Sequence, residues 1–355
     1  MTRRTLWRGL MWAVWGVLAL LLVAPLVSRE IRFVYRGGWE LARIQLRARP
    51  IADVLADPAT DSTTRANLEL GMAARQFAVD SLQLDAGESF TRFTDVGRDT
   101  LVLVLTASLH DTLSAYTWWF PLTGRVTYHG YYSRSKAERA ARRLEARGYD
   151  TYLRPAGAFS TLGWLPDPLL STSLYGTPGM AATVMHELAH NTVWFPGETQ
   201  FSESLASLIG YRGAEALFRA RGELGVATWL AFGWDRLRAE SRIQERLVAD
   251  LRAAFASERG PRERDSLRTA AFAVADSALR AQGLSGSHAL RTAIDEHNNA
   301  AVIAAGLYHG DLDGLEAAYQ SCGANIARLI QRAIDVRRAG AAEARASALQ
   351  CGDPE

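Results

Sequence analysis

His186, Glu187 and His190 form an HExxH motif, whose residue types and spacing could do chemistry on a metal ion. Residues four apart lie on one face of a helix, so the two imidazoles can converge on one ion. Glu187 lies about 100° round the helix, where its carboxylate can accept a proton from a metal-bound water. Residues 179–185 are apolar or small, which predicts a buried helix, and buried polar side chains need partners. We therefore predict one bound zinc ion.

A third protein ligand is needed, because two imidazoles and one water leave a tetrahedral zinc site incomplete. The Pro-Gly pair at 196–197 ends the first helix, and Thr199 or Ser202 is a plausible cap for a second one. That second helix has an apolar face made of Phe201, Leu205, Leu208 and Ile209. Glu203 lies beside this face and is predicted as the third ligand. Glu198 is the alternative, although its place near the turn suits a charge at a helix N-terminus.

The stretch HELAHNTVWFPGETQFSESLASLIG at 186–210 resembles the core of the putative bacterial aminopeptidase family, membrane-associated HExxH metallopeptidases of gluzincin type. Further similar segments lie at 120–124, 128–132, 160–164, 167–168 and 298–300. The resemblance covers most of the chain after about residue 35 and implies an aminopeptidase that acts on peptides. One departure is Ser202, where the family usually has Asn, and it leaves every predicted ligand in place.

The second oxyanion donor of such a peptidase is commonly a Tyr or His side chain. The candidates are Tyr211, Tyr308, His297 and Tyr175. Tyr308 and the pair Asn298-Asn299 lie in family-like segments, so we expect them to contact substrate. The alternative is that the asparagines cap or link helices and that Tyr308 belongs to the core. The histidines at 110, 288 and 309 are expected on the surface or on helix faces, and Asp167 is expected to shape a loop.

The N-terminus predicts a membrane anchor. Residues 1–8 are basic, and residues 9–27 contain no charged side chain, a length that can just span a bilayer. The tryptophans at 7, 12 and 15 suit the interface, and the arginines place this end in the cytoplasm. We expect a single-pass anchor over 1–28 in a bacterial inner membrane, with the catalytic part in the periplasm. A cleaved signal peptide is the alternative.

Composition adds two expectations. Cys322 and Cys351 are the only cysteines and could form a disulfide in an oxidising compartment, with two free thiols as the alternative. The net charge of +2 gives no electrostatic case for nucleic-acid binding.

Periodicity predicts an α+β fold, mainly α. Helices are expected at 39–55, 63–82 and 133–147, strands at 101–106, 115–120 and 149–154, and nearly continuous helix from 215 to about 348 with breaks at 260–261 and 283–286. A small sheet, the zinc helix and a helical lobe would then follow in order, as in gluzincins. We predict one metallopeptidase domain over 29–355, with parts at 29–165, 166–212 and 213–355.

Three functions fit these residues. The first is a zinc peptidase, an aminopeptidase by resemblance. The second is an envelope zinc endopeptidase, because we find no acidic motif that would hold a substrate's free amine. The third is a metal-dependent envelope binding or assembly factor with little proteolysis, although Glu187 argues against a purely structural zinc.

Overall fold

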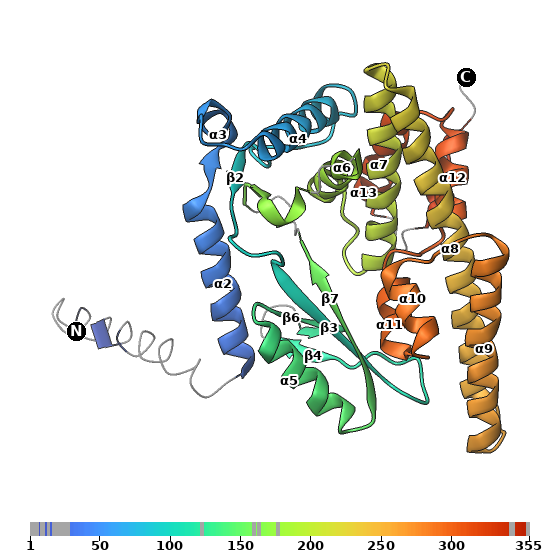
Figure 1. Ribbon diagram of the computed structural model, residues 1–355. Helices are drawn as coiled ribbons and strands as arrows, with labels where there is room; N and C mark the ends of the chain where they lie inside the picture. Colours follow the sequence, from blue (N-terminus) through green and yellow to red (C-terminus); the bar gives the residue numbers. More distant parts are fainter. Residues whose placement is uncertain are drawn as a thin grey trace.

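The computed structural model describes residues 29–120, 124–157, 161, 165–174, 178–340 and 345–352, together with Trp7, Met11, Trp12 and Trp15. Helices predominate and the sheets are small (Figure 1), which confirms the α+β, mainly α class. Most of the predicted anchor at 1–28 lies outside the described residues. Within the described ranges, no helix combines the length and apolar character needed to cross a membrane. The three-part division of 29–355 stays a prediction.

Three helices begin the described chain: α2 (Arg29–Arg47), α3 (Ile51–Ala56) and α4 (Ser62–Asp80). The prediction of one helix over 39–55 was wrong, because α2 ends at Arg47 and the short strand β1 (Arg49–Pro50) interrupts it. Proline has no N–H to continue a helix, and Pro50 instead occupies the N-cap position of α3. The helix predicted at 63–82 corresponds to α4, whose first turn is capped by the carboxylate of Asp61.

Among the described residues, eight strands form three sheets: β1, β2 (Arg92–Thr94) and β8 (Leu169–Leu170); β6 (Tyr128–Tyr131), β3 (Val102–Leu109) and β7 (Tyr149–Ala156); and β4 (Trp118–Phe120) with β5 (Gly124–Val126). β3 pairs antiparallel with both of its neighbours, and Leu105 lies opposite Leu153 of β7. Helix α5 (Arg134–Glu145) follows β6 and precedes β7, so a helix between strands, as predicted, precedes the HExxH helix.

The β6-β3-β7 sheet lies between two helices. Successive residues of a strand point to opposite faces. Leu153 packs in the cluster with α5, whereas its neighbour Tyr152 packs in the cluster with α11 (Asn299–Gly306). This sheet therefore connects the N-terminal half of the chain to the helical C-terminal part.

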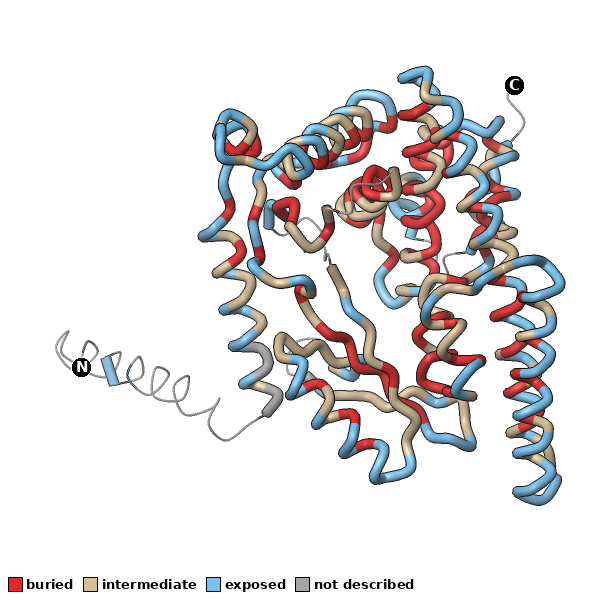
Figure 2. The backbone as a smooth tube through the Cα atoms, in the orientation of Figure 1, coloured by how far each residue is buried: buried red, intermediate tan, exposed pale blue. Residues whose placement is uncertain are grey.

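The largest hydrophobic core is built around α6 (Pro178–Thr192) and α7 (Thr199–Ala220), and Figure 2 shows buried residues concentrated along these helices and β3. The remaining helices are α8 (Leu224–Ala256), α9 (Pro261–Ala281), α10 (His288–Asp295), α12 (Leu312–Ser321) and α13 (Ile326–Arg338), with 3-10 turns at Ser171–Ser173 and Ala346–Leu349. The predicted breaks at 260–261 and 283–286 fall at the two ends of α9. Cys322 and Cys351 are joined by the predicted disulfide.

Candidate metal centre

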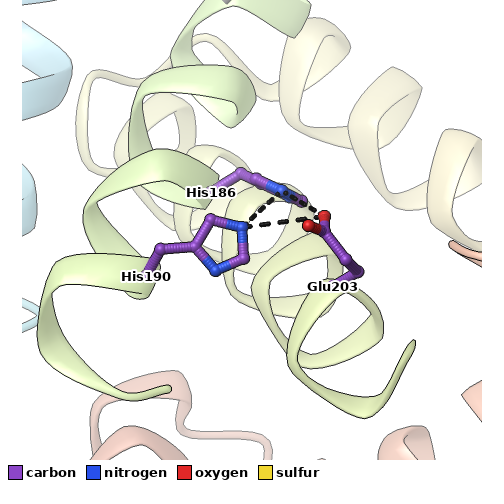
Figure 3. Close-up of side chains that lie close together, drawn as sticks. All are labelled: His186, His190 and Glu203. Atoms are coloured by element: carbon purple, nitrogen blue, oxygen red, sulfur yellow. Dashed lines mark hydrogen bonds and ion pairs between the residues drawn. The ribbon is translucent and has the colours of Figure 1, made fainter. Parts of the chain in front are cut away.

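Three predicted ligands converge between α6 and α7. The Nε2 atoms of His186 and His190 lie 3.2 Å apart. Oε2 of Glu203 lies 3.3 Å from Nε2 of His186 and 3.6 Å from Nε2 of His190 (Figure 3). The three potential donor atoms all fall within 4.8 Å of one another. The structure therefore brings together the two imidazoles and the carboxylate that the sequence spacing predicted to converge.

Two glycines of α7 let the helices approach closely enough for this convergence. A Cβ atom at Gly210 would lie 2.5 Å from the carbonyl oxygen of Ala182 and 3.3 Å from Cβ of His186. A Cβ atom at Gly213 would lie 2.7 Å from the sulfur of Met185. The contact at Gly210 is with backbone, so only a residue without a side chain fits there, whereas a side chain at Gly213 would require neighbouring side chains to move. Sequence reasoning missed this pair, although both glycines lie within an otherwise helical segment.

The turn between the two helices is fixed by Ser202, the residue that departs from the family pattern. The backbone N–H of Phe195 donates to Oγ of Ser202 at 3.1 Å. Glu198 occupies the N-cap position of α7 and lies outside the metal group. The geometry thus favours Glu203 over Glu198 as the third ligand.

The electrostatics of the group keep Glu203 ionised. Burial raises the pKa of this carboxyl, but hydrogen bonds and the charges of His186 and His190 outweigh burial and lower it to about 2. The buried Nδ1 of His190 has no hydrogen-bond partner among the described residues, and Nδ1 of His186 lies 3.5 Å from Oγ of Ser207. Two imidazole nitrogens and a carboxylate oxygen are a zinc donor set. This group can therefore hold a metal ion.

Glu187 lies next to the group and lines the same cavity as His186. Burial raises the pKa of Glu187, and the negative charges of Glu203 and Asp167 oppose its ionisation as well. A carboxyl with a raised pKa is a stronger base than an ordinary one once it is ionised, which suits proton transfer near neutral pH.

The cavity has a volume of about 630 Å³ and is mostly apolar. Its walls come from β7, α6, α7, α8, α10, α11 and the turn after α11. The Tyr308 ring lies in this turn, 6.4 Å from the His186 ring, with the Arg154 guanidinium 5.7 Å from its centroid. Burial, followed by the charge of Glu203, raises the pKa of Tyr308 to about 12. Tyr308 is therefore a protonated hydrogen-bond donor at neutral pH.

The model of one family, described as putative aminopeptidases, matches residues 32–349. The chain belongs to this putative aminopeptidase family. The matched range contains the whole metal group and every residue that lines the cavity. No curated protein and no solved structure matches the chain.

In this aminopeptidase-family chain, Asn298 and Asn299, which we expected to contact substrate, instead make the contacts of residues that cap and link helices. Asn298 accepts a hydrogen bond from the N–H of Ala301 and donates to the carbonyl of Thr151, both at 2.9 Å. Asn299 is fully buried, and its side-chain amide donates to the carbonyl of Leu109 at the end of β3 and to two carbonyls in the loop after it. Neither is among the described residues that line the cavity. They link α11 to the sheet.

The other candidates for the second oxyanion donor differ in their position relative to the cavity. Tyr211 lines the cavity together with Tyr308. His297 instead stacks on Phe272, with ring centroids 4.8 Å apart, and Tyr175 lies outside the described residues.

Sequence reasoning missed His309, which we expected on the surface or on a helix face. This side chain is only 4% exposed, lines the cavity, and has a pKa lowered to about 4 by burial. His309 follows α11 in an irregular turn, so no helical periodicity could mark it as buried. Of the other isolated histidines, His110 is exposed as expected, and His288 lines the cavity with its Nδ1 3.0 Å from the Tyr152 hydroxyl. The Asp167 carboxylate accepts a hydrogen bond from the N–H of Thr161 and so shapes its loop.

Proposed function

We propose that this chain is a zinc-dependent peptidase of gluzincin type. His186, His190 and Glu203 would hold the ion, and Glu187 would serve as general base. The observation that carries the proposal is the convergence of the three donor atoms within 4.8 Å, beside the half-buried carboxylate of Glu187 on the wall of one cavity. Membership of the putative aminopeptidase family supports peptide-bond hydrolysis as the reaction.

A zinc ion bound here would act as a Lewis acid and lower the pKa of water to about 7. The residues of the chain perform the proton transfers. Glu187 takes a proton from the attacking water and can then deliver it to the leaving amine. Tyr308, protonated and half-buried beside His186, can donate a hydrogen bond to the oxygen on which negative charge develops. The walls of the cavity are mostly apolar, and an apolar surrounding strengthens electrostatic interactions of this kind.

Cleavage of internal peptide bonds is a second candidate, favoured by the charges in the cavity. Arg154 lines the cavity, and Glu187 is the only carboxylate among its described lining residues. A guanidinium repels the protonated amine at the start of a peptide. The family description favours an aminopeptidase, whereas Arg154 favours an endopeptidase.

We also propose an extracytoplasmic location. The disulfide between Cys322 and Cys351 supports an oxidising compartment such as the periplasm. The uncharged residues 9–27 support an N-terminal anchor in the inner membrane, or a cleaved signal peptide.

Two variants test the assignment of roles. Glu187→Gln should keep the bound metal and lose hydrolysis by at least about a hundredfold, because the amide cannot accept the proton. His186→Ala should lose both metal and hydrolysis. Metal content by elemental analysis and cleavage of quenched peptides measure the two effects. An active Glu187→Gln protein would refute the role of Glu187, and a wild-type protein that binds zinc without cleaving peptides would favour a binding or assembly factor.

A further inference from the structure

Helix α2 has an exposed apolar stripe. Tyr35, Trp39 and Leu46 are 44%, 68% and 84% exposed. At about 100° per residue, all three lie within about 40° of one another on the helix circumference. The opposite side of α2 carries Ile44, which is buried in a cluster with Val96, Leu101 and Leu170. The packing of α2 on the protein therefore leaves the apolar stripe facing outward.

Arginines flank this stripe along one side. The arginines at 32, 36, 43 and 47 lie about 60–120° round the helix from Tyr35. An exposed stripe of tyrosine, tryptophan and leucine beside a row of arginines is the pattern of a helix that lies in a membrane interface. Aromatic side chains favour the headgroup level of a bilayer, and arginines bind its phosphates.

A basic groove extends this surface from α2 to α5. It has a volume of about 520 Å³, and its cationic side chains are Arg32, Arg36, Lys136, Arg139, Arg143 and Arg147. The described lining residues include no carboxylate, and Trp119, which is 55% exposed, lies at the same groove.

The cations of the groove crowd one another. Burial and the positive charges of Arg36, Arg139 and Arg32 lower the pKa of Lys136. Mutual repulsion of this kind is relieved when anions bind between the cations.

We propose that the stripe of α2 and the basic groove together form a docking face for a bilayer containing anionic phospholipids. The apolar stripe would enter the boundary between headgroups and acyl chains, and the groove would bind lipid phosphates. The uncharged sequence at 9–27 ends shortly before α2, which fits a membrane on this side of the chain. A nucleic acid would not use the apolar stripe, so the stripe favours lipid. The docking face shares no lining residue with the catalytic cavity, and the inference stands independently of the peptidase.

A single fluorescent label tests the insertion of α2. The two native cysteines are paired, so Trp39→Cys in the full-length chain provides one free thiol for a polarity-sensitive fluorophore. Val274→Cys is the control, since Val274 is 53% exposed on α9, on the far side of the molecule from α2 (Figure 1). With phosphatidylglycerol-containing vesicles, the label at 39 should shift to the blue and be quenched by a lipid-phase quencher. With pure phosphatidylcholine the change should be much smaller, and the label at 274 should not respond.

Charge reversal tests the groove in the same labelled protein. Arg36→Glu with Arg139→Glu should raise the vesicle concentration for half-maximal response by at least about tenfold. The control Arg252→Glu with Arg262→Glu makes the same change in net charge at exposed sites on α8 and α9 and should have a much smaller effect. Equal responses at 39 and 274, or equal effects of the two pairs, would overturn the proposal. Displacement of the vesicles by an oligonucleotide at the same concentration of phosphate would assign the groove to nucleic acid instead.

Discussion

Tyr308 lies beside the metal group, in an environment that suits a hydrogen-bond donor. Burial and the charge of Glu203 raise the pKa of its hydroxyl from the ordinary value of 10 to about 12, so the hydroxyl remains a donor even well above neutral pH. Glu187 is prepared for the opposite task, since its raised pKa makes it a better proton acceptor. Two titratable groups in distinct environments can thus take different roles, one as hydrogen-bond donor and the other as proton acceptor.

Replacement of Tyr308 by phenylalanine should remove one hydrogen bond from the developing oxyanion. We expect kcat to fall by about 10²–10³ and KM and metal content to stay nearly constant. Steady-state hydrolysis of a quenched peptide measures the split between kcat and KM. Tyr211→Phe is the matched variant, because Tyr211 also lines the cavity. A large fall in kcat for Tyr211→Phe and none for Tyr308→Phe would assign the oxyanion donor to Tyr211 instead.

At the scale of elements, the metal group depends on the close approach of α6 and α7. Gly210 faces the backbone of Ala182 one turn before His186, so the distance between the helices sets the separation of the imidazoles from Glu203. Ser202 holds the turn through the backbone of Phe195. The predicted ligand side chains and the contacts that position them are thus neighbours along the same two helices.

Substitution of Gly210 by alanine should therefore affect metal binding as well as stability. The added Cβ would meet a backbone oxygen at 2.5 Å, and the helices would have to separate. We expect a loss of about 1–3 kcal/mol in the free energy of unfolding and a clear loss of metal affinity. Denaturant unfolding and metal titration measure the two effects. Gly225→Ala is the control, since nothing lies within 4 Å of its added Cβ. Unchanged metal affinity in Gly210→Ala would show that the close approach does not position the ligands.

The sequence predicted those elements that are determined by residues close to one another along the chain. The HExxH spacing, the break at 196–197 and the helical breaks around α9 depend on periodicity and on Gly or Pro, which act locally. The two-residue strands β1 and β8 have no periodicity to detect, because pairing with the distant β2 defines them. Tertiary packing likewise determines the burial of His309 and the contacts of Asn299, so neither could be assigned from the sequence.

At the scale of the whole molecule, the cavity lies between the β7 edge of the small sheet and the helical part of the chain. Asn298 and Asn299 hold these two parts together through the backbone of β7, the end of β3 and the loop after β3. The disulfide ties the C-terminal segment to α12. The docking face lies on α2 and α5, away from the residues of the cavity.

The buried His309 should make the stability of the folded protein depend on pH. Burial lowers the pKa of this imidazole to about 4 in the folded protein, from the ordinary value of 6.5, so the unfolded chain takes up the proton first as pH falls. The free energy of unfolding should therefore decrease from about pH 6.5 and level off below about pH 4, by on the order of 3 kcal/mol.

Unfolding curves across this range should show a weaker pH dependence in His309→Gln than in the wild type. His110→Gln is the control, because the His110 side chain is 58% exposed. The same pH dependence in His309→Gln and wild type would contradict the neutral buried imidazole.

Reversible removal of the metal tests the central claim most directly. The purified full-length protein should contain about one zinc ion per chain and cleave aminoacyl or internally quenched peptides. A chelator should abolish cleavage, and one equivalent of added zinc should restore it, while Glu203→Gln should bind the ion more weakly. The preferred peptide would distinguish the aminopeptidase from the endopeptidase. Cleavage that persists after complete removal of metal, verified by elemental analysis, would contradict the account.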